Sequence, residues 1–341
     1  MTTAKGKGML MPDKLNIAQI GVGYWGPNLL RDLVANRHCH VSIVVDLSSE
    51  RRDYVRGLYP SITVTDDANQ LFNDPTIDAV VIATPVATHF ELAMKALESG
   101  KHVLVEKPMA TTIEEVDKIG NLAEGKNLVA MVGHTFLYNS AVRYTKTLID
   151  SGELGDIRYI YSQRVNLGRI RSDVDALWNL APHDISIIQY WLNDPVPTSV
   201  IRFGMAYVQK GVQDVVFMNI IYPNNVMANV HVSWLDPHKI RRITVVGSKK
   251  MLVYDDIAEN KIAIFDKGID RMAILGENMD FDNPINSNFS YRSGDVVLPK
   301  IKWKEPLIVE IEHFVDCIKN GIECLTNPEH AKRVIRILIT K

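Results

Sequence analysis

Short apolar runs alternate with helix-like segments over residues 15–133, and this alternation limits the folds open to the chain more than any other feature. Runs of this kind are typical of parallel strands that are buried on both faces, and the segments between them have the period of amphipathic helices. The runs lie at 15–20, 41–45, 79–83, 103–105 and 128–132. The pattern predicts an α/β domain with a doubly wound parallel sheet of the Rossmann type.

A glycine-rich turn at residues 21–26, with the sequence G-V-G-Y-W-G, joins the first run to the helical segment after it. On its own the G-x-G-x-x-G pattern is weak, but here a strand leads into it and a helix leaves it. The first glycine permits the tight turn, the second lets the backbone approach a pyrophosphate, and the third lets the helix pack closely. We therefore expect dinucleotide contacts from Gly21, Gly23, Tyr24, Trp25 and Gly26.

An acidic residue, Asp46, ends the second run, at the place where a carboxylate would meet the adenosine ribose. A carboxylate accepts hydrogen bonds from the ribose hydroxyls and repels a 2′-phosphate, which favours NAD over NADP. Ser48 and Arg51, with the neighbouring Arg52, lie close enough in sequence to leave NADP open. The alternative is a strand-turn-helix with incidental glycines that binds no phosphate.

The charges of the chain are nearly balanced, with 38 Lys and Arg against 40 Asp and Glu. This balance argues against a nucleic-acid or membrane-surface partner and favours a small molecule. We see no apolar run of signal-peptide or membrane-spanning length and expect a cytoplasmic protein. The scattered Cys39, Cys317 and Cys324 show no paired spacing for zinc, so we expect buried thiols and no metal site.

From about residue 157 the pattern changes to strand-like runs rich in Val, Ile and Tyr, which predicts a large open, mostly antiparallel sheet. The runs are 157–165, 214–222, 226–234 and 243–246, and helices are predicted at 182–192, 306–320 and 328–338. We expect a dinucleotide-binding domain over residues 1–135 and an α+β substrate-binding and oligomerisation domain over 136–341. The last helices could pack back on the first domain, and residues 276–293 are predicted to form a mobile loop.

Several motifs follow the glycine turn in order: A-T-P at 83–85, T-H at 88–89, E-K-P at 106–108 and N-L-A-P-H-D at 179–184. In this order the motifs resemble the Gfo/Idh/MocA family, the glucose-fructose oxidoreductase and inositol dehydrogenase group, over nearly the whole chain. The resemblance implies an NAD(P)-dependent oxidoreductase. It also implies a second domain whose open sheet covers the nicotinamide and commonly builds the dimer interface.

By this resemblance the family's invariant lysine falls on Lys107 and its catalytic histidine on His183. Oxidising a secondary alcohol needs a group that takes the hydroxyl proton, and histidine or a lysine pushed toward neutrality by burial fits that task. Without the family context, Lys107 could be a solvated loop lysine and His183 a capping or packing residue. The resemblance places Thr84, Pro85, His89, Glu106 and Lys107 among the cofactor contacts.

One position departs from the family pattern, because Asn179 stands where many members carry an aspartate. An amide can orient an imidazole by hydrogen bonding, but it cannot give an imidazolium a full negative charge. Asp184 is adjacent to His183, and neighbouring helix positions point in different directions, so it is not an obvious replacement. The departure shifts weight toward Lys107 for proton transfer.

An arginine-rich segment, residues 164–171, follows the first strand of the second domain and suits a phosphate or carboxylate, although a solvated edge strand would look similar. The motifs look most like the family branch that acts at C3 of nucleotide-linked hexoses in polysaccharide and deoxysugar biosynthesis. The predicted substrate contacts are Lys107, Tyr138, Asn139, Arg164, Asn166, Arg169, Asn179 and His183.

The sequence leaves two other functions open, and it also predicts an oligomer. A dehydrogenase of a free sugar or cyclitol such as myo-inositol is disfavoured by the arginines, since its substrate carries no charge. A non-catalytic NAD-binding sensor is disfavoured because Lys107 and His183 are both present. Apolar strands such as residues 215–218 usually need covering, so we expect a homodimer or homotetramer.

Overall fold

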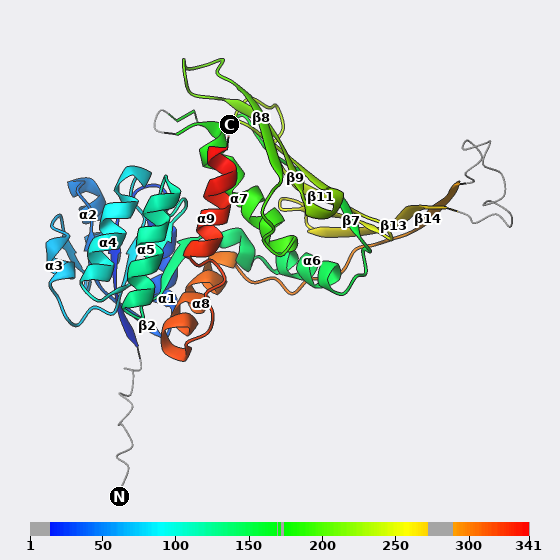
Figure 1. Cartoon of the computed structure of the whole chain (residues 1–341). Coiled ribbons are helices and arrows are strands. Elements are labelled where there is room, and N and C mark those ends of the chain that lie inside the picture. Colours follow the sequence, from blue (N-terminus) through cyan, green and yellow to red (C-terminus); the bar gives the residue numbers. More distant parts are fainter. Residues whose placement is uncertain (1–13, 169, 172–173, 272–288, 341) are drawn as a thin grey trace, which may run out of the picture. The chain divides into compact units, whose positions relative to one another are not determined.

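The computed structural model describes residues 14–168, 170–171, 174–271 and 289–340 (Figure 1). The chain divides into two compact units, which are described separately below. The first contains Met1–Thr135 and Glu305–Ile335, and the second contains Phe136–Lys304 and Arg336–Lys341. No helix among the described residues is both long and apolar enough to cross a membrane.

The first unit is built on a six-stranded parallel sheet with the order β3-β2-β1-β4-β5-β6. Its strands are β1 (Leu15–Ile20), β2 (Cys39–Val45), β3 (Thr63–Thr65), β4 (Ala79–Ile82), β5 (His102–Glu106) and β6 (Ala130–Gly133). The prediction of a doubly wound sheet is confirmed. The order reverses between β1 and β4, and ligands of open parallel sheets bind at the carboxyl ends of the strands at such a point.

Helices pack around this sheet (Figure 1). They are α1 (Gly26–Ala35), α2 (Ser49–Leu58), α3 (Asn69–Phe72), α4 (His89–Glu98), α5 (Ile113–Gly125) and α8 (Pro306–Asn320). Helix α9 (Pro328–Ile339) belongs to this unit as far as Ile335 and to the second unit from Arg336. Local side chains fix where several of them begin. Ser48 caps α2 by accepting the Arg51 N–H, and Thr112 and Glu115 form a capping box at the start of α5.

The second unit contains an eight-stranded sheet with the order β14-β13-β12-β11-β7-β10-β9-β8. Its strands are β7 (Ile157–Val165), β8 (Ser199–Met205), β9 (Val215–Tyr222), β10 (Val226–Ser233), β11 (Ile240–Gly247), β12 (Met251–Asp255), β13 (Ile262–Arg271) and β14 (Phe289–Val297). Within the described strands β10 pairs with β7 in parallel and the other neighbours are antiparallel, which confirms the predicted sheet. Helix α7 (Ala176–Trp191) packs on β7, β9 and β10, and α6 (Ser140–Asp150) packs on α7.

Two local predictions need correction. The helix that was predicted to open at Pro182 begins at Ala176, because the Asp175 side chain accepts the Trp178 N–H and caps it there. Pro182 therefore lies inside α7 and does not mark its start. The predicted loop at 276–293 is wrong for residues 289–293, which belong to β14, and its other residues lie outside the described part of the chain.

Candidate active site

Two glycines of the turn after β1 are required by the packing of the protein itself. Gly21 has a φ of +91°, and a Cβ there would lie 2.5 Å from the carbonyl oxygen of Ala83. A Cβ on Gly26 would lie 2.4 Å from the Gly21 carbonyl oxygen. Gly23 differs, since a Cβ there would meet no described atom within 4 Å. The glycine at this position leaves room over the backbone for a ligand such as a pyrophosphate, so the turn fits a dinucleotide.

Asp46 ties the end of β2 to this turn. Its Oδ2 accepts the Val22 N–H at 2.8 Å, and its Oδ1 accepts the Ser48 N–H at 2.8 Å. Arg52 donates to the Asp46 carbonyl oxygen at 2.8 Å. The side chains of Ser48 and Arg51 are exposed beside it. The structure thus places the predicted ribose-binding carboxylate next to the glycines, and its ribose contact stays a prediction.

The glycines provide a matched pair of substitutions. Gly23→Ala is expected to fold normally and to weaken NAD(P) binding by about 1–3 kcal/mol, roughly 10- to 100-fold in Kd, because the methyl group would crowd the pyrophosphate. Gly21→Ala is expected to lose roughly 2 kcal/mol or more of folding stability, because it combines a positive φ with a clash. Calorimetric titration and thermal unfolding separate the two effects. Unchanged cofactor affinity in Gly23→Ala would show that the turn does not hold the pyrophosphate.

The E-K-P motif begins at the carboxyl end of β5, at the same edge of the sheet as the glycine turn. Gly133 lies opposite Glu106 in the β5–β6 register, and a Cβ on Gly133 would lie 3.2 Å from Glu106 Oε1. The glycine therefore leaves room for the carboxylate. Glu106 accepts the Lys107 N–H at 3.2 Å and a hydrogen bond from the Trp25 side chain. The turn and the motif, far apart in sequence, are thus joined through Trp25 and Glu106.

A second buried carboxylate, that of Glu310 on α8, lies near Glu106 and was not predicted. The Thr135 hydroxyl donates to Glu310 Oε2 at 2.8 Å. Burial raises the pKa of Glu310 well above its usual value, and the nearby Glu106 raises it further. Burial also raises the pKa of Glu106 to about 7. A signal was present in the sequence, because Glu310 shares the apolar face of its helix with Leu307 and Phe314.

The buried carboxyl group of Glu310 should make the free energy of unfolding depend on pH. The pKa of Glu310 is higher in the folded chain than in the unfolded chain. The free energy of unfolding therefore falls as pH rises above the pKa that the group has in the unfolded chain. Glu310→Gln does not titrate and keeps an oxygen that can accept from Thr135. We expect the variant to be more stable than the parent at pH 8, with the difference shrinking toward pH 5. Denaturant unfolding across this range measures it, and a pH-independent difference would contradict the assignment.

His89 links the A-T-P and E-K-P segments. Its Nδ1 lies 2.8 Å from the Pro108 carbonyl oxygen, and its Nε2 lies 2.9 Å from the Thr84 carbonyl oxygen. The ring is buried, and burial lowers its pKa. Pro85 is exposed at the same edge. Both ring nitrogens of His89 face backbone carbonyl oxygens, and its predicted contact with the nicotinamide, like those of Thr84 and Pro85, stays a prediction.

In the second unit, His183 is half-buried on α7, and its ring packs edge-on against Phe136 with centroids 5.0 Å apart. The Arg164 guanidinium also lies over the Phe136 ring, at 4.5 Å. Arg164 forms a two-pronged ion pair with Asp184, with Nε–Oδ2 at 2.9 Å and Nη2–Oδ1 at 3.0 Å, and both side chains are buried. The guanidinium predicted to meet a substrate diphosphate therefore has a carboxylate of its own unit as its partner.

The structure gives Asn139 a structural role. Its Oδ1 accepts the Ala141 N–H at 2.8 Å and caps α6, and its Nδ2 donates to the Tyr254 hydroxyl at 3.2 Å. Asn139 is fully buried, and Tyr138 is 1% exposed. Both side chains are buried, and their predicted contacts with a sugar stay predictions that the proposal below does not use.

The remaining predicted substrate contacts lie near the end of β7 and on α7. Asn166 follows β7 and is half-buried. Asn179 precedes His183 by one helical turn, and its Oδ1 accepts the Trp234 indole N–H at 3.3 Å. Arg169 lies outside the described residues. Asn166, Asn179 and His183 therefore stay predictions within the second unit.

Two family models match the chain. Residues 15–134 match the model described as "Oxidoreductase family, NAD-binding Rossmann fold". Residues 142–253 match the "GFO/IDH/MocA C-terminal domain". The first match covers the six strands of the parallel sheet, and the second runs from α6 into β12 of the eight-stranded sheet.

Curated relatives carry several activities. The uncharacterized oxidoreductase YdgJ of Escherichia coli is 32% identical over 255 residues, covering 70% of each chain. The NADP-dependent scyllo-inositol 2-dehydrogenase IolW of Bacillus subtilis is 32% identical over 132 residues, covering 39% of this chain and 36% of IolW. UDP-N-acetylglucosamine 3-dehydrogenase of Acidithiobacillus ferrooxidans is 29% identical over 194 residues, covering 56% and 59%. The solved structure of that enzyme, GnnA, matches with a TM-score of 0.77 at 23% identity over 96% of both chains, which shows the shared fold.

Proposed function

Because the chain belongs to the Gfo/Idh/MocA family of NAD(P)-dependent oxidoreductases, we propose that it moves a hydride between a nicotinamide and C3 of a nucleotide-linked sugar. The observation that carries the proposal is the edge of the parallel sheet where Trp25 of the glycine turn meets Glu106, beside Lys107. This edge combines a place for the cofactor with a side chain that can hold a proton. The enzyme class is that of dehydrogenases acting on CH–OH groups.

The bound cofactor would supply the hydride acceptor, and the protein would handle the proton. We propose that Lys107 accepts the proton of the substrate hydroxyl during oxidation and returns it during reduction. His183 is proposed to share this task from the second unit. The adjacent Asp184 is ion-paired with Arg164. We propose the greater role for Lys107 because the amide of Asn179, one helical turn before His183, cannot give an imidazolium a full negative charge.

The nucleotide part of the substrate rests on two observations. One relative is named a UDP-N-acetylglucosamine 3-dehydrogenase. The segment after β7 also carries Arg169 and Arg171, whose guanidinium groups suit a diphosphate. We propose that these two arginines, with Asn166, hold the diphosphate. Arg164 is left out because its guanidinium already binds Asp184.

One relative is named a scyllo-inositol 2-dehydrogenase, which supports uncharged cyclitols as a second candidate substrate class. The test is a panel of UDP-sugars, dTDP-sugars, free hexoses and inositols, assayed by nicotinamide absorbance with the parent and with Arg169→Ala. We expect turnover with a nucleotide sugar and a raised KM in the variant. Turnover of a free polyol alone, with no effect of Arg169→Ala, would refute the nucleotide proposal.

We also propose that the second unit pairs with further copies of the chain through one face of its sheet, here called the apolar sheet face. Phe203 lies opposite Phe217, and Phe217 lies opposite His231 and stacks on it with ring centroids 4.1 Å apart. Phe203 is 71% exposed and Phe217 is 48% exposed. The exposed large apolar side chains of this face are Tyr159, Tyr161, Ile201, Phe203, Met205, Phe217, Ile221 and Met227.

Exposed apolar side chains gathered on one face of four neighbouring strands are typical of an interface. A second copy is the natural occupant, because a flat open sheet can cover an identical sheet by two-fold symmetry. Helix α7 packs on three of these four strands, β7, β9 and β10. A homodimer or homotetramer built on the apolar sheet face therefore agrees with the exposure pattern.

A single charge should disrupt this assembly. Phe203→Glu is expected to convert the oligomer to monomers, because it would bury an unpaired carboxylate in an apolar interface. Val196→Glu is the matched control, since Val196 is an exposed apolar residue outside the face. Light scattering of dilute protein measures the mass. A monomeric parent, or a Phe203→Glu variant that stays assembled, would show that this face is not the interface.

A further inference from the structure

Three potential metal ligands meet in the first unit, on α8 and in the segment that follows it. They are His313, Cys317 and Cys324, and their ligand atoms all lie within 4.8 Å of one another. The sequence predicts thiols without a metal-binding spacing, but the fold brings two of the three cysteines close to one another and to a histidine. Cys39 lies on β2 and is not part of the cluster.

Local backbone structure explains how the cluster forms. His313 and Cys317 are four residues apart on α8, so their side chains share one face of the helix. The helix ends at Gly321, which has a φ of +65° and turns the chain back on itself. This reversal brings Cys324 to the other two residues. The spacing H-x₃-C-x₆-C is therefore produced by a helical pair and a helix-ending turn.

We propose that His313, Cys317 and Cys324 form a binding site for a thiophilic metal ion, with Zn²⁺ as the ion of best fit. One imidazole and two thiolates are ligands that Zn²⁺ prefers. The His313 Nε2 and Cys317 Sγ atoms are 3.4 Å apart. Two such ligands in a tetrahedral zinc site are separated by about 3.5 Å, given typical Zn–N and Zn–S bond lengths. The pair needs little movement to share an ion.

The imidazole is already held in the tautomer that a metal needs. The Leu325 N–H donates to His313 Nε2 at 3.0 Å, so Nε2 carries the lone pair and the proton belongs on Nδ1. A bound ion would take over this lone pair from the Leu325 N–H. The two thiols would lose their protons, so binding would release protons to solvent.

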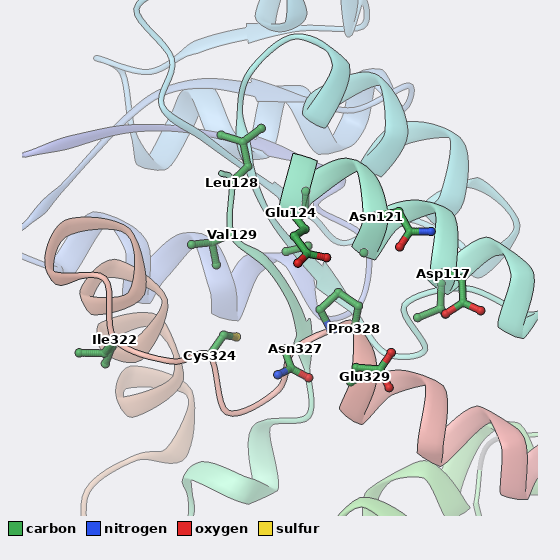
Figure 2. A pocket seen from close by; sticks show the side chains of 14 residues that line it. Asp117, Asn121, Glu124, Leu128, Val129, Ile322, Cys324, Asn327, Pro328 and Glu329 are labelled. Carbon is green, nitrogen blue, oxygen red and sulfur yellow. The ribbon is translucent and has the colours of Figure 1, made fainter. Parts of the chain in front are cut away.

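One of the three ligands, Cys324, borders an open pocket. Cys324 lines an open pocket with Asn327 and Glu124, and Figure 2 shows its sulfur at the wall of that pocket between α5 and the segment before α9. Water or an exchangeable ligand could complete a tetrahedral shell there. The pocket also gives the ion an entry path.

The site would fasten the segment between α8 and α9 to the parallel sheet. Residue Thr326, two positions after Cys324, accepts the Val132 N–H at 2.9 Å through its carbonyl oxygen. Val132 lies on β6, the edge strand of the six-stranded sheet. An ion bound at Cys324 would therefore hold the segment that covers this edge, which is a structural and not a catalytic role.

The test uses the full, untagged chain, reduced and freed of metal. Zn²⁺ is titrated in competition with a chromophoric chelator, and Co²⁺ is added separately to read the coordination from its absorption bands. We expect one Zn²⁺ per chain, thiolate-to-cobalt charge-transfer bands, and a higher Tm with Zn²⁺. Cys324→Ser should weaken Zn²⁺ binding at least roughly 100-fold, since even the loss of an outer partner of a metal ligand costs 10- to 100-fold.

Cys39→Ser is the matched control and should bind Zn²⁺ like the parent. NAD(P) binding and circular dichroism report whether each variant is folded, and His313→Asn provides a second ligand deletion if Cys324→Ser fails to fold. The proposal is overturned if the reduced parent binds no Zn²⁺, or if binding is equal in the parent, Cys324→Ser and His313→Asn. Formation of a Cys317–Cys324 disulfide with peroxide, in a chain that binds no Zn²⁺ when reduced, would also overturn it and identify a redox pair.

Discussion

Lys107→Ala is expected to lower kcat by about 10²–10⁴-fold, the usual contribution of a positioned proton-transfer group. The lysine follows β5 at the edge where the glycine turn and Glu106 meet. Removing its amino group takes away the proposed proton acceptor, which is the neutral amine, and leaves intact the turn that is proposed to hold the cofactor. NAD(P) affinity should therefore change far less than kcat.

Single-turnover kinetics on the preferred substrate measure the chemical step, and fluorescence titration measures the cofactor Kd. Lys95→Ala is the matched control, because Lys95 is an exposed lysine of α4 in the same unit. It should behave like the parent in both measurements. A Lys107→Ala enzyme with normal kcat would assign the proton to another group, and a parent that binds NAD(P) but turns over no substrate would favour a sensor.

Arg164→Ala is expected to lower the free energy of unfolding by about 3–5 kcal/mol, because it leaves the Asp184 carboxylate buried without its partner. Arg164 is 4% exposed and Asp184 is 1% exposed. Asp184→Ala should have a similar effect through the unpaired guanidinium. The double variant Arg164→Met/Asp184→Leu should recover much of the loss, since it removes both buried charges.

Denaturant unfolding gives these free energies. Arg242→Ala is the control, because the Arg242–Asp255 pair is more exposed and should contribute less than about 1 kcal/mol. The opposite pattern would be a stable Arg164→Ala variant with a strongly raised substrate KM. That pattern would return Arg164 to the substrate contacts that the sequence suggested.

The parallel sheet could be predicted from the sequence because its signals are local. Each buried strand is a short apolar run, and the turn at Gly21 carries its own glycine spacing. The three-residue strand β3 was missed because Thr63–Thr65 is too short to show a period. Strand β14 was missed because its mixed polar residues are exposed and carry no burial pattern.

The candidate site could be predicted only in part, because side-chain partners depend on contacts between distant segments. Glu310 joins Thr135 and approaches Glu106 only after α8 has packed on the first unit. Arg164 looked free to bind a diphosphate because nothing in the sequence pairs it with Asp184. The sequence also did not predict that Cys324 lies beside α8, because this contact depends on the backbone turn at Gly321.

The central claim is a direct hydride transfer between C3 of a nucleotide-linked sugar and a nicotinamide, and isotope transfer tests it directly. The purified chain is incubated with NAD⁺ or NADP⁺ and UDP- or dTDP-hexoses that carry deuterium at C3, and the reduced cofactor is analysed by mass spectrometry. The account predicts deuterium in the reduced nicotinamide, with transfer lowered about 10²–10⁴-fold in Lys107→Ala. Label arriving from C-deuterated myo-inositol, with none from any nucleotide sugar, would contradict it.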